Sequence, residues 1–262
     1  MNMIADLLAG IGAAVLEALG LLGELAVFAL SGLSQLVRPP FYFRMFGRSL
    51  MEIGFYSLPV VALTALFTGM VLALQSYTGF SRFNAESQIA AVVILSVTRE
   101  LGPVLAGLMV SGRAGAAMAA ELGTMRVTDQ VDALSTLSTD PMKYLVAPRL
   151  LAGIVALPLL VVVADILGVM GGFLVSVLKL GFNPSTYLLN SYNTLQRNDV
   201  VSGLIKAAVF GFVIALMGCF NGYRSRGGAQ GVGAATTAAV VSASILILAL
   251  DYVLTQLLFH VL

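Results

Sequence analysis

Four charged residues lie in stretches of this chain that are otherwise apolar enough to cross a membrane. Arg99 and Glu100 are adjacent, and Asp165 and Asp251 follow in two later apolar stretches. A charge near the centre of a bilayer costs about 3 kcal/mol on insertion scales, so such side chains are expected to face protein or water. Neighbouring helical residues point about 100° apart, so Arg99 and Glu100 are expected to find partners on other helices, with Asp165 and Asp251 as the available carboxylates. This charge cluster either fixes the register of a helix bundle or takes part in opening a path through it.

A second polar group is the continuous segment 121–134, between two long apolar stretches. It reads Glu-Leu-Gly-Thr-Met-Arg-Val-Thr-Asp-Gln-Val-Asp-Ala-Leu. Gly123 is expected to interrupt a helix, Thr128 to cap the start of a new one, and Asp129 to lie in its first turn, where a carboxylate favours the helix dipole. Apolar residues at i, i+4 and i+7 from Val127 then share one face. The segment is therefore predicted to be a short helix that lies against the membrane and offers polar side chains to a partner.

The composition explains why these polar groups stand out. Of 262 residues, 59% are hydrophobic and 10% are charged, whereas a soluble domain carries roughly 25% charged residues. We therefore expect an integral membrane protein. The single Cys219 and single His260 exclude a disulfide framework and a Cys/His metal cluster, and the net charge of +1 provides no strong field to attract nucleic acid. The glycine-rich run 227–233 lacks the Gly-Lys-Ser/Thr ending of a phosphate-binding loop, so this chain is not expected to be an ATPase.

Five apolar segments are long enough to cross a bilayer as helices, which takes about 20 residues. They are residues 53–76, 88–112, 148–178, 200–220 and 234–260. With the N-terminus in the cytoplasm, nine Lys and Arg residues fall inside and four outside, as the positive-inside rule favours; Arg99 is not counted because it lies within a span. The C-terminus is then periplasmic. Pro59, Pro103 and Pro158 are expected to kink their spans rather than end them.

The N-terminal segment, residues 1–37, is apolar but carries Asp6, Glu17 and Glu24 on one helical stripe. It is predicted to lie in the membrane interface as an amphipathic helix. The alternative is a sixth span, which would have to carry three carboxylates and would reverse the side of the C-terminus. Arg38-Pro39-Pro40 is expected to end this helix. The predicted fold is thus all-α, with an interfacial segment followed by one five-span domain, residues 38–262.

Several separated motifs resemble those of the MlaE (YrbE) family of ABC-transporter permeases, which move lipids between bacterial membranes. In order along the chain, these motifs are Arg99-Glu-Leu-Gly-Pro-Val104, Gly112-Arg-Ala-Gly115, Glu121-Leu-Gly-Thr-Met-Arg-Val-Thr128 with Asp129-Gln130, Asp140-Pro141, Pro148-Arg149 and Asn221-Gly-Tyr223. The resemblance covers most of the chain after residue 40. The acidic stripe of residues 1–37 is not part of it, and the role of that stripe stays open.

The resemblance implies a homodimer in the bacterial inner membrane that moves phospholipid or a related lipid to or from an extracytoplasmic MCE-type carrier. It implies two copies of a separate cytoplasmic ATPase that binds ATP and magnesium, while this chain binds no cofactor and catalyses no reaction. A small STAS-type accessory protein is a further implied partner. The implied ATPase contacts are Glu121, Gly123, Thr124, Arg126, Thr128, Asp129 and Gln130. The implied lipid contacts, on the first and last spans, are Leu72, Gln75, Tyr77, Phe80, Leu248 and Tyr252.

Two other classes of function compete with this interpretation. An ion-coupled transporter or channel would use Arg99, Glu100, Asp165 and Asp251 and would work without an ATPase. A lipid-modifying membrane enzyme would need a nucleophile with a base or a metal site. The chain carries neither a His-Glu-x-x-His nor a Gly-x-Ser-x-Gly motif, which argues against the enzyme.

Overall fold

The structure is a computed structural model that describes residues 2–83 and 85–261. The side chains of residues 2–11, 14, 18, 37 and 259–261, with Asp6 and His260 among them, lie outside this description. The described residues form helices joined by short turns, with no β-strand among them. The predicted all-α fold is confirmed.

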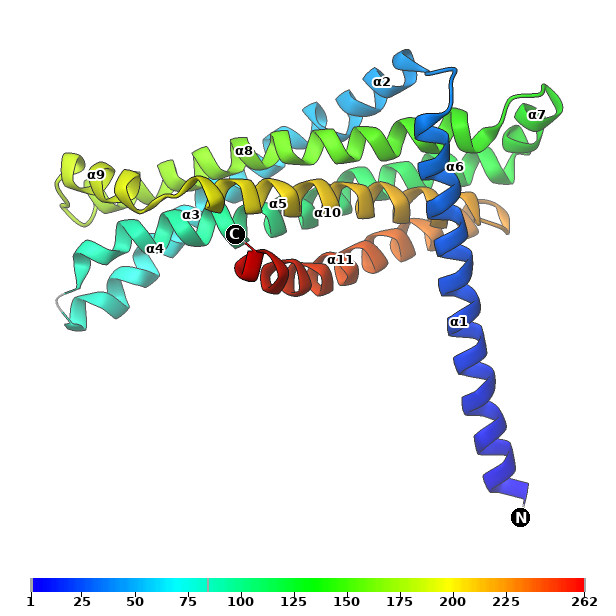
Figure 1. Ribbon diagram of the computed structural model, residues 1–262, viewed down its shortest axis with the longest axis horizontal. Coiled ribbons are helices and arrows are strands. Elements are labelled where there is room, and N and C mark those ends of the chain that lie inside the picture. The colour runs from blue at the N-terminus through cyan, green and yellow to red at the C-terminus, as the bar shows by residue number, and fades with distance from the viewer. Residues whose placement is uncertain (1, 84, 262) are drawn as a thin grey trace.

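Five long helical rods pack along the length of the molecule (Figure 1), and the first three are built from pieces that follow one another without a loop. The first rod consists of α2 (Phe43–Ile53), η1 (Phe55–Ser57), α3 (Leu58–Phe80) and η2 (Ser81–Phe83). The second consists of η3 (Glu86–Gln88), α4 (Ile89–Ser96), η4 (Val97–Leu101), α5 (Gly102–Val110), η5 (Ser111–Gly115) and α6 (Ala116–Val127). The third is η6 (Met142–Val146) with α8 (Ala147–Leu178), the fourth is α10 (Arg197–Tyr223) and the fifth is α11 (Gly228–Val261). Two short helices, α7 (Gln130–Thr136) and α9 (Pro184–Thr194), lie at opposite ends of the bundle.

Each rod contains a segment long and apolar enough to cross a membrane. These segments are Phe43–Phe83, Glu86–Val127, Met142–Leu178, Arg197–Tyr223 and Gly228–Leu258. The rods extend beyond the predicted spans because the helices continue past the apolar stretches, most of all where α6 prolongs the second rod. Pro59 lies in the first turn of α3 and Pro158 lies inside α8, and neither ends its rod.

Glycines allow α3, α8 and α10 to approach one another closely. A Cβ atom on Gly69 would overlap the backbone carbonyl of Gly168, and one on Gly211 would overlap the carbonyl of Gly153. The α3–α8 and α8–α10 contacts are therefore made backbone against backbone at these points. The main apolar core packs around α8 and α10, the two central rods.

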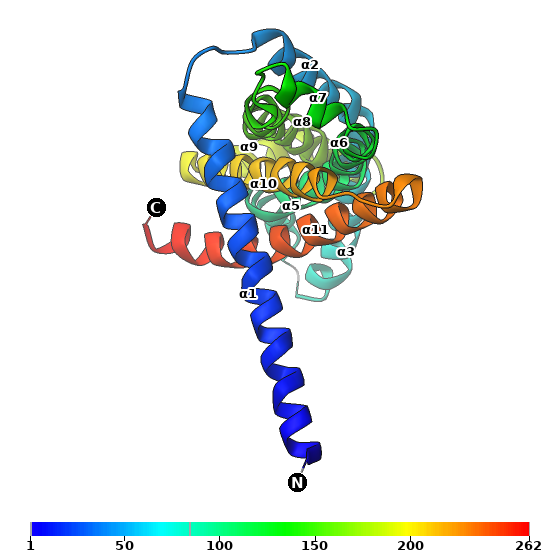
Figure 2. The same cartoon turned by 90° about the vertical axis from the view of Figure 1, so that its right-hand side faces the viewer.

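Helix α1 (Asn2–Val37) lies across the bundle rather than along it. Figures 1 and 2 show it crossing the rods at a steep angle near the α7 end, with its N-terminal half projecting away. As predicted, it ends where Arg38-Pro39-Pro40 begins. Its segment Val15–Leu36 would also be long and apolar enough to span a membrane, the sixth such segment in the chain. Because α1 runs across the direction of the five rods, its orientation favours the interfacial position, which stays a prediction.

The C-terminal half of α1 is docked on the bundle. The ring of Phe28 packs edge-on against that of Phe220, with 5.5 Å between centroids. From the acidic stripe, Glu24 pairs with Arg224 at 3.1 Å, while Glu17 is exposed. One member of the stripe therefore helps to attach α1 to the end of α10.

Candidate functional site

Two groups of charged residues tie the second rod to its neighbours, and each is built around one buried cation. We name them the Lys206 cluster and the Arg149 cluster. The Lys206 cluster consists of Arg99, Glu100, Asp199, Lys206 and Asp251. The Arg149 cluster consists of Arg48, Glu52, Glu121 and Arg149.

Lys206 on α10 is the centre of the first cluster. Its side chain is only 2% exposed, and its Nζ lies 2.7 Å from Oε2 of Glu100 and 3.0 Å from Oδ1 of Asp251. The contact with Glu100 is a hydrogen bond, whereas the contact with Asp251 is an ion pair without hydrogen-bond geometry. The hydroxyl of Thr255 also donates to Glu100, at 3.3 Å. One ammonium group therefore joins η4, α10 and α11 and balances carboxylates from two of them.

Pro103 explains a third contact of Lys206. In an α-helix the N–H of residue 103 would donate to the carbonyl of Arg99, but proline has no N–H. The π-helical turn η4 ends with the N–H of Gly102 donating to the carbonyl of Val97. Nζ of Lys206 donates to the carbonyl of Arg99 at 3.1 Å. Lys206 thus satisfies a buried acceptor that proline leaves open, and this stabilises the bulge.

Arg99 and Asp199 form the other half of the cluster. Nε of Arg99 donates to Oδ1 of Asp199 at 2.7 Å. The Asp199 side chain is 2% exposed, and it also accepts from the backbone N–H of Gln196 at 2.9 Å in a capping box that begins α10. As expected, Arg99 and Glu100 each find partners on another helix. Neither expected carboxylate is one of these partners, since Arg99 pairs with Asp199 and Glu100 with Lys206, and Asp251 joins the cluster through Lys206.

Sequence reasoning missed Asp199 and Lys206. Both fall near the start of the fourth apolar stretch, where Lys206 counts as a residue of the outer membrane boundary. The capping box of Gln196 and Asp199 gives only a weak sequence signal, because such boxes usually begin with Ser or Thr. The predicted span 200–220 already contains Lys206, so what the sequence did not give is its partners, which lie on other helices.

A hollow of about 280 Å³ opens beside the Lys206 cluster. The side chains of Arg99 and Glu100 border it and are 39% and 40% exposed. Gln196, Asn198 and Ser202 add polar groups to its wall. The cluster is therefore buried around Lys206 and Asp199 but open on its other side.

Asp165 does not belong to this cluster, and its expected membership is wrong. It lies on α8 in a separate, largely apolar groove of about 460 Å³ that α9 and α10 also border. Its Oδ1 atom is buried without a hydrogen-bond partner among the described residues and lies against the backbone of Gly102. The reason is geometric, because α8 meets the second rod at Gly102, while Lys206 and Asp251 approach from α10 and α11.

The Arg149 cluster lies nearer the α7 end. The Arg149 side chain is 4% exposed and donates 2.7 Å hydrogen bonds to Oε2 of Glu121 and to the carbonyl of Leu145. Arg48 of α2 lies 4.0 Å from the other oxygen of Glu121 and pairs with Glu52 at 3.1 Å. Glu121 therefore links α2, α6 and α8, so it is engaged within the chain.

The polar segment 121–134 is not a single helix. Gly123 interrupts nothing, since it lies inside α6, buried against the α10–α11 connection. Thr128 follows the end of α6, and its hydroxyl donates back to the carbonyl of Thr124 at 2.8 Å. The break falls at Asp129, which has a left-handed φ of 57° and precedes α7. The interruption expected at Gly123 and the cap expected at Thr128 are therefore wrong, because packing on α10 and α11 keeps α6 helical.

The exposed part of this end is the turn and α7, residues 128–138. Arg126 pairs with Asp132 and lies 5.7 Å from the ring centroid of Tyr223, which attaches α7 to the bundle. The apolar side chain of Leu137 is 75% exposed. Of the expected ATPase contacts, the exposed ones are Thr124, Thr128, Asp129 and Gln130.

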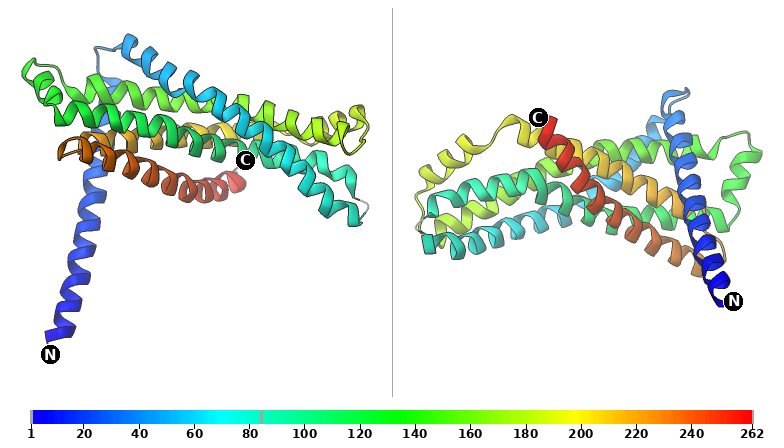
Figure 3. Two further views of the ribbon diagram at one scale, coloured as in Figure 1. Left: turned by 180° about the vertical axis from the view of Figure 1, so that it is seen from behind. Right: turned by 60° about the horizontal axis from the view of Figure 1, so that its bottom comes forward.

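The six expected lipid contacts divide into two sets. Leu72, Tyr77 and Phe80 pack against a small core between α3 and α4. Gln75, Leu248 and Tyr252 are exposed, the last two by 55% and 68%. Helix α3 packs mainly on α8, and α11 mainly on α10 and α6; Figure 3 shows the bundle that contains both helices from behind and from below. One copy of the chain therefore does not bring the two sets together.

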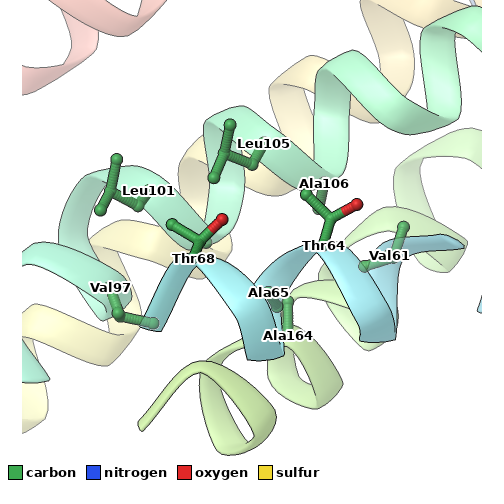
Figure 4. Close-up of a pocket in the computed structure, with 10 residues that line it drawn as sticks. Val61, Thr64, Ala65, Thr68, Val97, Leu101, Leu105, Ala106 and Ala164 are labelled. Carbon is green, nitrogen blue, oxygen red and sulfur yellow. The ribbon is translucent and has the colours of Figure 1, made fainter. Parts of the chain in front are cut away.

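A narrow groove separates α3 from the second rod (Figure 4). Thr64 and Thr68 of α3 lie along it opposite Leu101 and Leu105, and Ala164 of α8 lies at its base. Its wall is apolar apart from the two threonine hydroxyls. The groove lies along the first half of α3, before the expected lipid contacts, which begin at Leu72.

The rods, the crossing α1 and the two internal charge clusters define a multi-pass helical membrane protein. The chain belongs to the MlaE permease family, because the family model for permease MlaE matches residues 46–257. It is 57% identical over 259 residues to a probable ABC transporter permease protein of Rickettsia bellii, covering 99% of this chain and 100% of that one. It is 35% identical over 261 residues to the intermembrane phospholipid transport system permease protein MlaE of Haemophilus influenzae, covering 98% and 99%. The membership that the motifs indicate is confirmed, and the chain is an ABC transporter permease.

Proposed function

We propose that two copies of this chain form the membrane part of an ATP-driven phospholipid transporter in the bacterial inner membrane. The family supports the permease role, and the name of the Haemophilus influenzae relative describes intermembrane phospholipid transport. Two copies of a separate cytoplasmic ATPase would supply ATP and magnesium binding, since this chain has no phosphate-binding loop. An MCE-type carrier would exchange lipid on the opposite side, with a small STAS-type protein as a further partner.

The observation that carries the proposal is the rigid connection between the exposed residues 128–138 and the bundle. The second rod continues unbroken from Glu86 to Val127 and ends directly at this turn. Arg149 holds that rod to α8 through Glu121, and Arg126 holds α7 to α6. A partner that moves the turn must therefore move the second and third rods with it.

The α7 end is placed in the cytoplasm, with α1 in the inner interface and the α9 end and C-terminus on the periplasmic side. The positive-inside count supports this orientation. The exposed polar side chains of Thr128, Asp129 and Gln130, together with Leu137, then form the ATPase contact. Glu121, Gly123 and Arg126 support that contact from within.

The lipid path is proposed to lie between two copies, along α3 and α11. Leu63, Phe67 and Val71 form one exposed stripe on α3, each more than half exposed. Ile245, Leu248 and Tyr252 form a similar stripe on α11. Facing stripes from two copies would enclose an apolar cavity for lipid tails, with Gln75 at its polar end. Leu72, Tyr77 and Phe80 would shape its wall from behind.

The test is Leu137→Glu, which places a charge on the exposed apolar side chain of the proposed ATPase contact. Truncating a hot-spot residue of an interface costs about 2 kcal/mol or more, or roughly 30-fold in affinity. We expect the ATPase to stop co-purifying with the variant, and ATP-driven transfer of a fluorescent phospholipid from proteoliposomes to fall at least as much. Asp129→Lys is expected to act in the same direction. Its melting temperature is also measured, because lysine suits a left-handed φ less well than aspartate.

The matched control is Tyr192→Glu on α9, which alters a side chain that is 81% exposed at the opposite end of the bundle. It should retain the ATPase. If Leu137→Glu and Asp129→Lys both bind the ATPase as well as the unmodified chain does, residues 128–138 are not its contact. Transport driven by an ion gradient in the absence of the ATPase would instead support the ion-coupled alternative, for which the hollow beside the Lys206 cluster is the natural site.

A further inference from the structure

A second apolar pocket lies at the joint between α1 and the bundle, away from the α3 and α11 stripes. It has a volume of about 160 Å³ and is enclosed by the end of α1, the linker 38–42, the start of α2 and the start of α8. Leu36, Phe41, Phe46, Pro148 and Leu151 form most of its apolar wall. The pocket therefore lies between α1 and the parts of the bundle, α2 and the start of α8, that α1 meets at this joint.

One cation lines this apolar pocket, and two more lie next to its lining residues in the chain. Lys143 lines it and donates one hydrogen bond to the carbonyl of Pro39, which leaves two of its three N–H groups for another acceptor. Arg38 and Arg44 lie in the linker and in the first turn of α2, are exposed, and form no ion pair within the described part of the chain. The nearby carboxylate, Asp140, is occupied by the amide of Gln35 and the N–H of Met142, at 2.7 Å and 2.9 Å.

Exposed aromatic rings mark the same place as a membrane boundary. Phe41 and Phe43 are 54% and 77% exposed, with 6.1 Å between their ring centroids. The first rod starts at Phe43 and the third starts at Met142, so this joint lies where two spans begin. Aromatic side chains and clustered Lys or Arg at the end of spans are typical of the headgroup region, and basic pockets between such helices bind anionic lipid headgroups.

We propose that this pocket binds one anionic phospholipid, with an acyl chain in the apolar pocket and its phosphate among Lys143, Arg38 and Arg44. The lipid comes from the leaflet on the α7 side and is a resident of the joint, separate from the transported lipid. Bound there, it holds α1 at a constant angle to α2 and α8. The choice of an anionic lipid follows from charge, because the segments around the pocket carry three cations, while the nearby carboxylate Asp140 already has hydrogen-bond partners.

The test compares phosphatidylglycerol with phosphatidylcholine of identical acyl chains, offered as a mixture to the complete complex in detergent and detected by native mass spectrometry. Each cation near a headgroup contributes roughly 1 kcal/mol, or about fivefold in binding. The unmodified protein should therefore retain phosphatidylglycerol preferentially. The double variant Arg38→Gln/Arg44→Gln should lose about 25-fold of that preference. Both side chains are exposed, so the variant is expected to fold.

The matched control is Arg82→Gln/Lys179→Gln, which removes two exposed cations from the opposite end of the spans. It should leave the preference unchanged. Lys143→Gln should lower the preference by about a further fivefold. The proposal is overturned if the unmodified protein shows no preference, or if the control variant reduces the preference as much as Arg38→Gln/Arg44→Gln does.

Discussion

The Lys206 cluster and the Arg149 cluster attach the same rod to its neighbours in different ways. Each buries one cation, 2% exposed for Lys206 and 4% for Arg149, against a carboxylate of the second rod, Glu100 or Glu121. Lys206 contacts two carboxylates and a backbone carbonyl beside a hollow. Arg149 contacts one carboxylate and a backbone carbonyl of its own helix.

Side-chain chemistry accounts for the difference. An ammonium group has three donors on a flexible stem, so Lys206 can collect partners from three helices. A guanidinium group is planar and holds a carboxylate in a fixed direction, so Arg149 fixes α6 against α8. The end that meets the ATPase in our proposal is therefore the one held by a directional contact, and the opposite end carries the cluster that is open to a hollow.

The largest loss of stability is expected for Lys206→Met. It leaves Glu100 and Asp251 close together without their cation, and Asp251 is only 21% exposed. Removing one partner from a buried ion pair costs about 3 kcal/mol. The melting temperature in detergent should fall accordingly. Adding Asp251→Asn should restore part of the loss, and an unchanged melting temperature for Lys206→Met would show that the cluster is hydrated throughout.

Arg149→Met should also lower the melting temperature, but by less than Lys206→Met does. The carboxylate left behind, Glu121, is 37% exposed, so water replaces part of the lost interaction, and the expected cost is about 1 to 2 kcal/mol. The same melting measurement ranks the two variants. A larger loss for Arg149→Met than for Lys206→Met would reverse the comparison.

Asp165→Leu tests a carboxylate outside both clusters. Since Oδ1 of Asp165 is buried without a partner in the described structure, removing it should leave stability unchanged or raise it by about 1 kcal/mol. Leucine has the same branching at Cγ, and its larger apolar methyl groups match the apolar groove. A clear drop in melting temperature would mean that Asp165 has a stabilising partner in the assembled transporter.

Thr255→Val should produce the smallest loss of stability of these variants. It removes a hydroxyl whose single proton is shared between Glu100, at 3.3 Å, and the carbonyl of Asp251, at 2.7 Å, while it keeps the shape of the side chain. The expected loss is below about 1 kcal/mol, because Lys206 still neutralises Glu100. A loss equal to that of Lys206→Met would place the hydroxyl, rather than the ammonium, at the centre of the cluster.

Much of the architecture could be predicted from particular residues. Apolar stretches predicted the five rods, and Pro39 and Pro40 predicted the end of α1, because both signals act locally. The predicted break at Gly123 was wrong because a glycine can allow close packing inside a helix as well as end one. The prediction that Asp165 belongs to the charge cluster was wrong because a carboxylate in an apolar stretch indicates burial but does not identify the residue that it contacts.

The sequence by itself determined that this chain is an all-helical membrane permease with charges inside its spans, since hydropathy, helix ends and family motifs are all properties of short segments. Only the tertiary structure decided which charges meet. The pairs Glu121–Arg149, Arg99–Asp199 and Glu100–Lys206 join residues that are 28, 100 and 106 positions apart. Each pairing depends on how far every rod is rotated about its own axis, and close packing between helices sets that rotation.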